Sequence, residues 1–322
     1  MKDISFLNSS EFNIDRLLNL KGNRRIFAVF STFGEREAQL VYDKISLLYS
    51  EANNFIDKIF LSHRRVTSDK IEQTEINAKR AHPDVEVLIC NSMSVPDMGD
   101  ERGKGADMRR LLYYVNRIYR GSTAENEIII VFLDADVESR YFGTHFVLGL
   151  AGAIIEGFDF AKASFWRAMG RVKKYVAQPL FSLIEHPKLK MLTKFAYPLS
   201  GEVAGTLDFF NSVDFWQMYG IETGMIIDAC FKDYRVADVN LGLYDHEHQS
   251  EIDIQKMSFG IMRTFLMQLL KHDIIGLKDG AKIGNIFELS YINENAKRSS
   301  NVFELNELRY TPLKILFDSG KM

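Results

Sequence analysis

The feature that most constrains the fold is the stretch of residues 128–136, with the sequence IIIVFLDAD. Its run of β-branched and aromatic residues is typical of a strand buried on both faces in the middle of a parallel sheet. Asp134 and Asp136 end it, and residues i and i+2 of an extended chain point the same way. At the carboxyl edge of an open sheet such a pair predicts a divalent cation that also binds a diphosphate. The alternative is a strand-end turn in which one aspartate caps the next helix.

Length and composition indicate an ordinary globular protein. At 322 residues the chain has room for one large α/β domain with an appendage, or for two modest domains. Hydrophobic residues make up 46% and charged residues 26%, which excludes a disordered chain. The net charge of −3 gives no global field that would attract nucleic acid or an acidic membrane surface. Any recognition of phosphate must therefore be local.

Three sequence features favour the cytoplasm. Cys90 and Cys230 lack metal-ligand spacing and suit two buried thiols in a reducing compartment. The first 15 residues lack the basic start and apolar core of a signal peptide. The longest helical apolar run, residues 146–155, is far shorter than the roughly 20 residues that a membrane span needs. We therefore expect a cytoplasmic protein without a membrane segment.

Hydrophobic periodicity predicts alternating strands and helices in the first 100 residues, after a polar N-terminal arm over residues 1–24 that is either a short helix or an irregular segment. The predicted strands cover residues 26–31, 58–62 and 85–90, and the predicted helices cover residues 37–50 and 68–81. This βαβαβ order predicts a doubly wound, mostly parallel sheet with right-handed crossovers.

Lys104 lies between Gly103 and Gly105 and opens a predicted helix. Backbone N–H groups, the helix dipole and the ammonium together favour an anion at such a helix start. The motif is not a Walker A loop, because its spacing is short and no Ser or Thr follows the lysine. A flexible turn without binding function is the alternative.

Further polar residues lie downstream. Arg171 follows Gly170 at a predicted helix start with Lys173 and Lys174 nearby, which indicates either an anion site or a solvated helix face. Glu222 begins an apolar helix, where it is either a ligand-facing acid or a partner for the helix dipole.

His246 and His248 follow a predicted strand, and one histidine joining a carboxylate site is favoured over a structural zinc site. The stretch from Ile252 predicts a long apolar helix that packs on the main domain or forms a homodimer interface.

Taken together, these motifs resemble those of retaining glycosyltransferases with the GT-A fold, such as glucosyl-3-phosphoglycerate synthase and, more distantly, mannosylglycerate synthase. The matching stretches lie in family order over about residues 25–270, so their joint signal is strong although each alone is weak. They are residues 103–105, 134–136, 170–172, 198–202, 219–222 and 239–242, the last leading to His246.

The resemblance implies a fold, a reaction and a set of residue roles. It implies a Rossmann-like GT-A domain over residues 25–250 and a C-terminal helical extension over residues 251–322 that is a possible dimer contact. It implies transfer of a hexose, with glucose preferred, from a UDP- or GDP-sugar with Mg²⁺ or Mn²⁺ bound. The implied catalytic residues are Glu222, Asp136 and Leu199, and the implied metal ligands are Asp136 and His246. Nucleotide-sugar binding falls to Glu35, Ser62, Lys104, Asp134 and Ala135, and acceptor binding to Gly170, Arg171, Ser200, Gly201 and His248.

The sequence departs from the family pattern mainly where the acceptor binds. Tyr244 and His248 stand where an arginine and an asparagine are usual, and Lys173 replaces a threonine. Phe33 and Gly34 replace the usual Asn-Glu of the nucleoside loop. The expected acceptor is 3-phosphoglycerate, and the alternative acceptor is free D-glycerate. The alternative to an enzyme is a non-catalytic protein that binds a nucleotide sugar.

Overall fold

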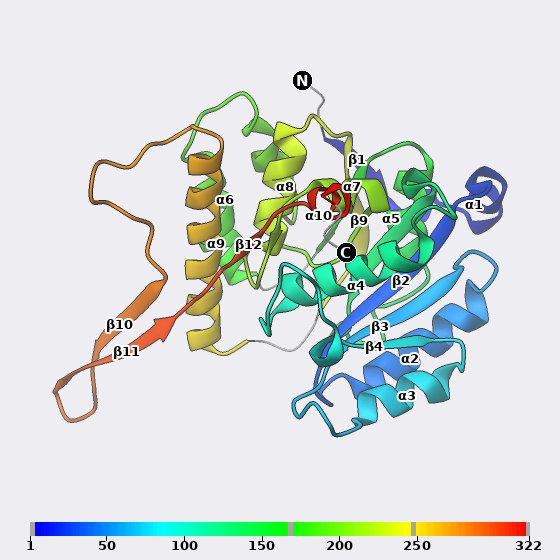
Figure 1. Ribbon diagram of the computed structural model, residues 1–322, viewed down its shortest axis with the longest axis horizontal. Coiled ribbons are helices and arrows are strands. Elements are labelled where there is room, and N and C mark those ends of the chain that lie inside the picture. Colours follow the sequence, from blue (N-terminus) through cyan, green and yellow to red (C-terminus); the bar gives the residue numbers. More distant parts are fainter. Residues whose placement is uncertain (1–3, 167–169, 246–248, 320–322) are drawn as a thin grey trace.

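The computed structural model describes residues 4–166, 170–245 and 249–319, and its centre is one large sheet with helices on both faces (Figure 1). The strands of this sheet are β1 Ser5–Asn8, β2 Arg25–Phe33, β3 Lys58–Arg64, β4 Glu86–Ile89, β5 Ile128–Asp134, β6 Phe160–Trp166, β7 Val203–Thr206 and β9 Val236–Leu243. The helices are α1 Ile14–Lys21, α2 Ala38–Glu51, α3 Gln73–Ala81, α4 Lys104–Tyr119, α5 His145–Ile155, α6 Gln178–Ser182, α7 Leu207–Ser212, α8 Ile221–Phe231, α9 Glu251–Lys271 and α10 Leu313–Asp318. Shorter pairs are formed by β8 Phe215–Trp216 with β12 Arg309–Tyr310, and by β10 Ile286–Ile292 with β11 Arg298–Glu304.

The sheet confirms the predicted doubly wound, mostly parallel architecture. Its described strands run in the order β1-β9-β6-β7-β5-β2-β3-β4. Only β7 among them is antiparallel to its neighbours, β5 and β6. The chain runs outward from β2 through β3 to β4 and then returns to β5 on the other side of β2. The carboxyl ends of β2 and β5 therefore form a switch point, where open α/β sheets bind their ligands.

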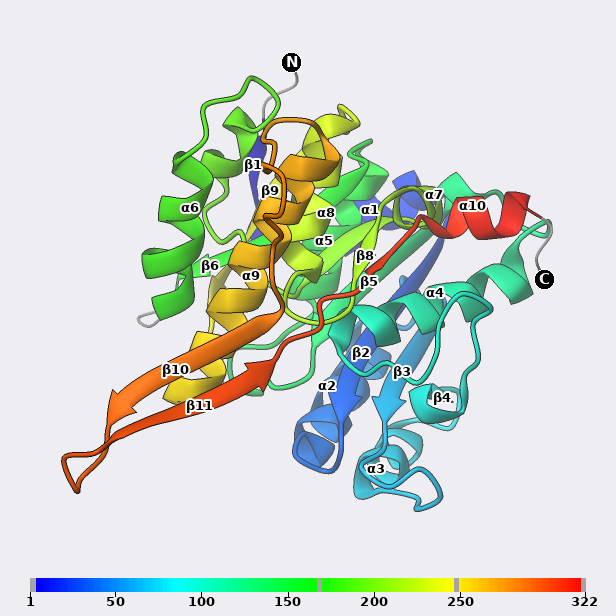
Figure 2. The ribbon, with the colours of Figure 1, turned by 60° about the vertical axis from the view of Figure 1, so that its left-hand side comes forward.

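Strand β5 is buried on both faces, as its continuous apolar sequence predicts. Alternate residues enter two separate cores because successive side chains of a strand point to opposite faces. One core, beside α4, α7 and α8, receives Ile128, Ile130 and Phe132. The other, beside α2 and α5, receives Ile129, Val131 and Leu133. Figure 2 shows the two helical layers on either side of the strands.

Two helix starts differ from the sequence prediction. Helix α3 begins at Gln73, five residues later than predicted, because Glu72 and Glu75 form a capping box that fixes its start. Helix α5 begins at His145 rather than near Arg140. The N-terminal segment contains a short helix, α1, which was one of the two expectations, and the strand β1, which was not predicted, lies parallel to β9.

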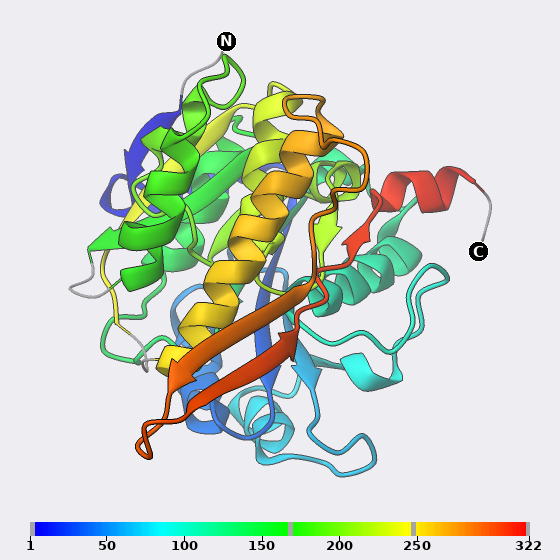
Figure 3. The same cartoon turned by 90° about the vertical axis from the view of Figure 1, so that its left-hand side faces the viewer.

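The segment after residue 250 begins with the predicted long helix, α9, which buries Ile261, Phe265 and Leu269. The predicted C-terminal helix is therefore present, and the residues after it form strands and a second short helix. A two-stranded hairpin, β10–β11, projects from the body and crosses one end of α9, where Phe287 lies 5.5 Å from the Phe259 ring (Figure 3). The chain then adds β12 to β8 and ends in α10.

Two further sequence expectations can be compared with the structure. Cys90 and Cys230 are both buried and free. None of the helices in the described part of the chain combines the length and apolar character needed to cross a bilayer.

Candidate active site

A pocket of about 570 Å³ opens at the carboxyl ends of β2, β3 and β5. The strand register places its polar residues, because Ser31 of β2 is aligned with Ser62 of β3 on one side and with Asp134 of β5 on the other. All three line the pocket. Its size lies within the range of pockets that bind whole small-molecule ligands.

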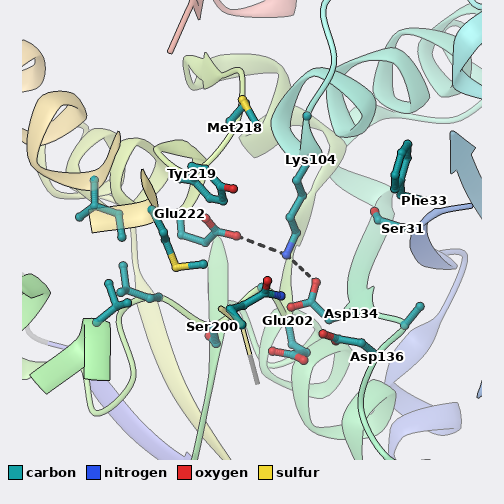
Figure 4. Close-up of a pocket in the computed structure, with 18 of the residues that line it drawn as sticks. Ser31, Phe33, Lys104, Asp134, Asp136, Ser200, Glu202, Met218, Tyr219 and Glu222 are labelled. Atoms are coloured by element: carbon teal, nitrogen blue, oxygen red, sulfur yellow. Dashed lines mark hydrogen bonds and ion pairs between the residues drawn. The ribbon is translucent and has the colours of Figure 1, made fainter. Parts of the chain in front are cut away.

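Lys104 is at the centre of the pocket, between two carboxylates from different elements (Figure 4). It is the first residue of α4, and its Nζ lies 2.5 Å from Asp134 Oδ1 and 3.3 Å from Glu222 Oε1. Burial disfavours the charged ammonium, but Asp134 and Glu222 outweigh burial and raise the pKa of Lys104. The lysine therefore carries a firmly held positive charge at a helix start.

The chain passes directly over this cluster at Gly201. A Cβ there would overlap Lys104 Nζ and Asp134 Oδ2, so both side chains would have to move to admit it. The adjacent Ser200 is held in place, because its carbonyl accepts a hydrogen bond of 2.7 Å from Lys162 Nζ and its hydroxyl donates to Ala163 O. A side chain at 201 would therefore disturb the pairing of the lysine with its carboxylate.

Asp136 lies in the turn after β5 and lines the same pocket. The pKa of Glu37 is raised mainly by burial, and the negative charge of Asp136 is the second cause. Burial and then Asp134 raise the pKa of Glu202, which is 0% exposed, to about 8. Burial is the larger cause of both increases, and the negative charges of Asp136 and Asp134 add to it.

A divalent cation fits this environment. Hard cations bind carboxylate oxygens and complete their shell with water and phosphate. No cluster of three metal-binding side chains occurs among the described residues, so Asp136 would have to share the ion with a bound ligand or with residues outside them. His246, the predicted second ligand, lies outside the described residues.

The opposite wall contains the predicted acceptor residues. Arg171 follows Gly170, whose φ of +127° is readily adopted only by glycine, and its guanidinium forms an ion pair with Glu251 at the start of α9. Tyr244, which stands where the resembled family has arginine, is buried and stacked 3.8 Å from the Phe165 ring. Burial and the nearby Glu202 raise the pKa of Tyr244 well above its usual value.

The structure brings most of the predicted site residues into one pocket. Those that line it are Ser62, Lys104, Asp134, Ala135, Asp136, Gly170, Arg171, Leu199, Ser200, Gly201 and Glu222. Glu35 is not among the lining residues, and its carboxylate instead accepts a hydrogen bond of 2.8 Å from Gln73 N. His248, like His246, lies outside the described residues. The individual roles of all these residues stay predictions.

Sequence reasoning assigned no role to several groups at the pocket. Glu202 is the last residue of the family-like stretch 198–202, but nothing in the sequence showed that its carboxylate is buried. Glu37 lies just before α2 and also lines the pocket. Lys44 donates hydrogen bonds to the carbonyls of Ala135 and Val137. Its helical spacing from the buried Val41 and Leu48 was the available signal.

No family model matches this chain. Its sequence is 28% identical over 291 residues to the glucosyl-3-phosphoglycerate synthase of Petrotoga mobilis, covering 85% of this chain and 82% of that protein. The enzyme of the same name from Mycobacterium tuberculosis is 26% identical over 275 residues, covering 79% of this chain and 76% of that protein.

The fold is similar to that of solved structures of mannosyl- and glucosyl-3-phosphoglycerate synthases. A mannosyl-3-phosphoglycerate synthase from Rubrobacter xylanophilus superposes with a TM-score of 0.80 at 22% identity, covering 98% of this chain and 99% of that chain. A glucosyl-3-phosphoglycerate synthase from Mycobacterium tuberculosis in complex with Mg²⁺ and uridine diphosphate has a TM-score of 0.76 at 24% identity, covering 97% and 99%.

Fold and sequence together define a glycosyltransferase with the GT-A fold. Within that class the chain resembles the glucosyl-3-phosphoglycerate synthases.

Proposed function

We propose that this protein is a metal-dependent retaining glycosyltransferase that moves glucose from UDP-glucose to the 2-hydroxyl of 3-phosphoglycerate. The observation that carries the proposal is the single pocket wall on which Lys104, Asp134, Asp136 and Glu222 converge. The relatives named above supply the choice of donor and acceptor. GDP-sugars and mannose are the alternative donors, since a mannosyl enzyme has the same fold.

The donor side of the reaction follows from charge. Asp136, with His246 as the predicted second ligand, would hold Mg²⁺ or Mn²⁺, which supplies positive charge to the diphosphate of the donor. Lys104 adds a second positive charge at the start of α4. Charge that develops on the departing diphosphate is then stabilised by groups already in position, which is a large source of catalysis. Glu222 lies 3.3 Å from the same ammonium and is our candidate for the acid beside the reacting sugar.

The acceptor side rests on Arg171. A guanidinium binds a phosphate or carboxylate with two parallel hydrogen bonds, which a lysine cannot do. Gly170, Ser200 and Gly201 form the neighbouring wall and would shape the space for a small acceptor. His248 is the remaining predicted acceptor contact.

Free D-glycerate is a second candidate acceptor. It is favoured by Tyr244, which places a neutral, stacked ring at a position where the resembled family has a cation. Loss of the cation at position 244 weakens discrimination in favour of a phosphorylated acceptor, and Lys173, which replaces a threonine, leaves a positive charge elsewhere on that wall.

The test is an assay of the purified full-length chain with UDP- and GDP-hexoses, crossed with 3-phosphoglycerate and D-glycerate, in Mn²⁺, Mg²⁺ or EDTA. We expect transfer only with a divalent metal, best with UDP-glucose and 3-phosphoglycerate, and with retention of the anomeric configuration by NMR. Binding of UDP-glucose without transfer to either acceptor would support the non-catalytic alternative instead.

We also propose a cytoplasmic homodimer with its contact in residues 251–322. The hairpin β10–β11 exposes Ile286, Ile292 and Val302, which are 54%, 68% and 60% accessible. Light scattering after size-exclusion chromatography, with the hairpin residues 285–305 replaced by a short linker as control, measures the mass directly. A monomer before the replacement would contradict the dimer.

A further inference from the structure

Lys44 of α2 is a buried lysine directly beneath the turn that carries Asp136. Lys44 is only 1% exposed, although lysine is almost never fully buried without partners. The ammonium lies 2.9 Å from the carbonyl oxygen of Ala135 and 2.5 Å from that of Val137. It therefore binds the carbonyl groups of the two residues that flank Asp136 in the sequence.

The surroundings show why this charge is tolerated. Burial lowers the pKa of Lys44 to about 8, while the acidic groups Asp136, Asp43, Glu37 and Glu202 oppose that decrease. The Phe142 ring lies 5.5 Å from the ammonium and adds a cation–π contact. Hydrogen bonds to two carbonyls and the negative charge of nearby carboxylates thus compensate the ammonium for its lost hydration.

The hydrogen bonds have a geometric consequence for the aspartate. Strand β5 ends at Asp134, and backbone pairing resumes at residues 137–138, where Glu138 N donates to Asp245 O at 3.2 Å. Residues 135–136 form the turn between these two points, and such connections are generally more mobile than the strands that they follow. Contacts to the carbonyls before and after Asp136 restrain the backbone from which its side chain projects into the pocket.

We propose that Lys44 is a positioning residue for metal binding: by fixing the carbonyls of Ala135 and Val137, it holds the Asp136 carboxylate where a nucleotide-bound divalent cation is captured. The inference rests on the proposed function only in that Asp136 contacts such a metal. It does not depend on the identity of the sugar or of the acceptor.

The chain contains a matched control. Lys21 of α1 is also a buried lysine, 9% exposed, and its Nζ donates to a carbonyl, Phe55 O, at 2.8 Å. It also lies 6.0 Å from a phenylalanine ring and pairs with Asp57. Lys21 is not among the residues that line the pocket. Lys44→Met and Lys21→Met therefore remove the same chemistry from two places.

The experiment measures Mn²⁺ binding to the full-length protein with UDP present, by EPR of free Mn²⁺. We expect Lys44→Met to weaken Mn²⁺ binding about 10- to 100-fold, the range for losing a group that orients a metal ligand. Lys21→Met should stay within about twofold of wild type. UDP binding in EDTA, measured by calorimetry, should change little in either variant, because neither Lys44 nor Lys21 is among the residues that line the pocket.

Folding is checked for each variant by circular dichroism and thermal melting. If Lys44→Met does not fold, Lys44→Gln carries the test, since its shorter neutral side chain still donates but cannot reach both carbonyls. Mn²⁺ affinity within twofold of wild type in a folded Lys44 variant would overturn the proposal. Wild-type protein that binds no Mn²⁺ with UDP would instead contradict the metal dependence of the proposed function.

Discussion

The two walls of the pocket are built in different ways. The strand-end wall, consisting of Ser31, Ser62, Lys104, Asp134 and Asp136, lies at the ends of neighbouring strands and at a helix start. Its parts are aligned by backbone ladders, in which Ser31 pairs with both Ser62 and Asp134. Such a wall is held by hydrogen bonds that do not depend on which side chains are present.

The loop wall consists of Gly170, Arg171, Tyr197 and Tyr244, and in the sequence it adjoins the two internal stretches outside the described residues. Side-chain pairs hold it, such as the Arg171–Glu251 ion pair and the stack of Tyr244 on Phe165. A single substitution can therefore change its chemistry without disturbing the sheet. The difference suggests that binding of the nucleotide is set by the fold, whereas choice of the acceptor is set by a few exchangeable side chains.

The largest expected effect tests the strand-end wall. Asp136→Asn removes the charge that the metal requires, and we expect kcat/KM to fall by about 1000-fold or more, which is about 4 kcal/mol of transition-state stabilisation. Steady-state assays with UDP-glucose and Mn²⁺ measure it. Asp159→Asn is the matched control, because Asp159 lies at the opposite edge of the sheet and accepts a hydrogen bond from Arg235 N. Near-normal activity of Asp136→Asn would remove Asp136 from the metal site.

The second prediction tests the loop wall. Arg171→Ala should lower kcat/KM for 3-phosphoglycerate by about 30- to 1000-fold, since a charge-assisted pair to an anion is worth about 2–4 kcal/mol. Hydrolysis of the donor by water, if present, should survive, because the strand-end wall is untouched. Equal losses with 3-phosphoglycerate and D-glycerate, together with better wild-type activity on glycerate, would contradict a phosphate site at Arg171.

The same contrast explains how far the sequence could predict the structure. The buried strand ending in Asp134 and the helix beginning at Lys104 were readable because periodicity and glycine flanks are local signals. Their meeting in one site was implied only by the resemblance to glycosyltransferases, because Lys104 begins a helix and no strand pattern places it. What could not be read were contacts between residues far apart in sequence that no local pattern links, such as Arg171 with Glu251.

The C-terminal segment shows the same limit. Long helix α9 was predicted from its apolar stripe, whereas the hairpin β10–β11 was not. Its strands alternate between exposed and half-buried positions without a strong apolar run, so the pattern in residues 286–304 is weak. The burial of Lys44 and Glu202 likewise depends on tertiary packing, which propensity does not encode.

The third prediction concerns Glu202, which is buried beneath the strand-end wall and also adjoins Tyr244 of the loop wall. Its pKa is raised from 4.5 to about 8 by burial and Asp134, so the folded state keeps a proton that the unfolded state releases. The contribution of Glu202 to the free energy of unfolding therefore falls as the pH rises from about 4.5 to 8. Glu202→Gln cannot titrate, so its melting temperature relative to wild type should rise by several degrees between pH 5 and pH 8.

Thermal melts of both proteins at pH 5, 6.5 and 8 without metal measure this difference. The lowered pKa of His63 acts in the opposite direction below about pH 6.5 but is present in both proteins and cancels. A difference that does not vary with pH would show that Glu202 is charged throughout, and the crowding of negative charge at the pocket would then be relieved in another way.

The smallest expected effect concerns the contact that occupies Arg171. Glu251 presents a carboxylate to the same guanidinium that the acceptor would use, so the two anions compete. Its side chain is 73% exposed, and exposed ion pairs contribute about 0–1 kcal/mol, so the gain from removing it is limited to about fivefold. Glu251→Gln should therefore lower KM for 3-phosphoglycerate about two- to fivefold with kcat unchanged. The start of helix α9 should remain stable, because Ser250 still accepts a hydrogen bond from Asp253 N.

In an Arg171→Ala background the Glu251→Gln substitution should have no effect, since no guanidinium remains to be released. A higher KM in the single variant would mean that Glu251 orients Arg171 for the acceptor, and the loop wall would then be as preorganised as the strand ends opposite.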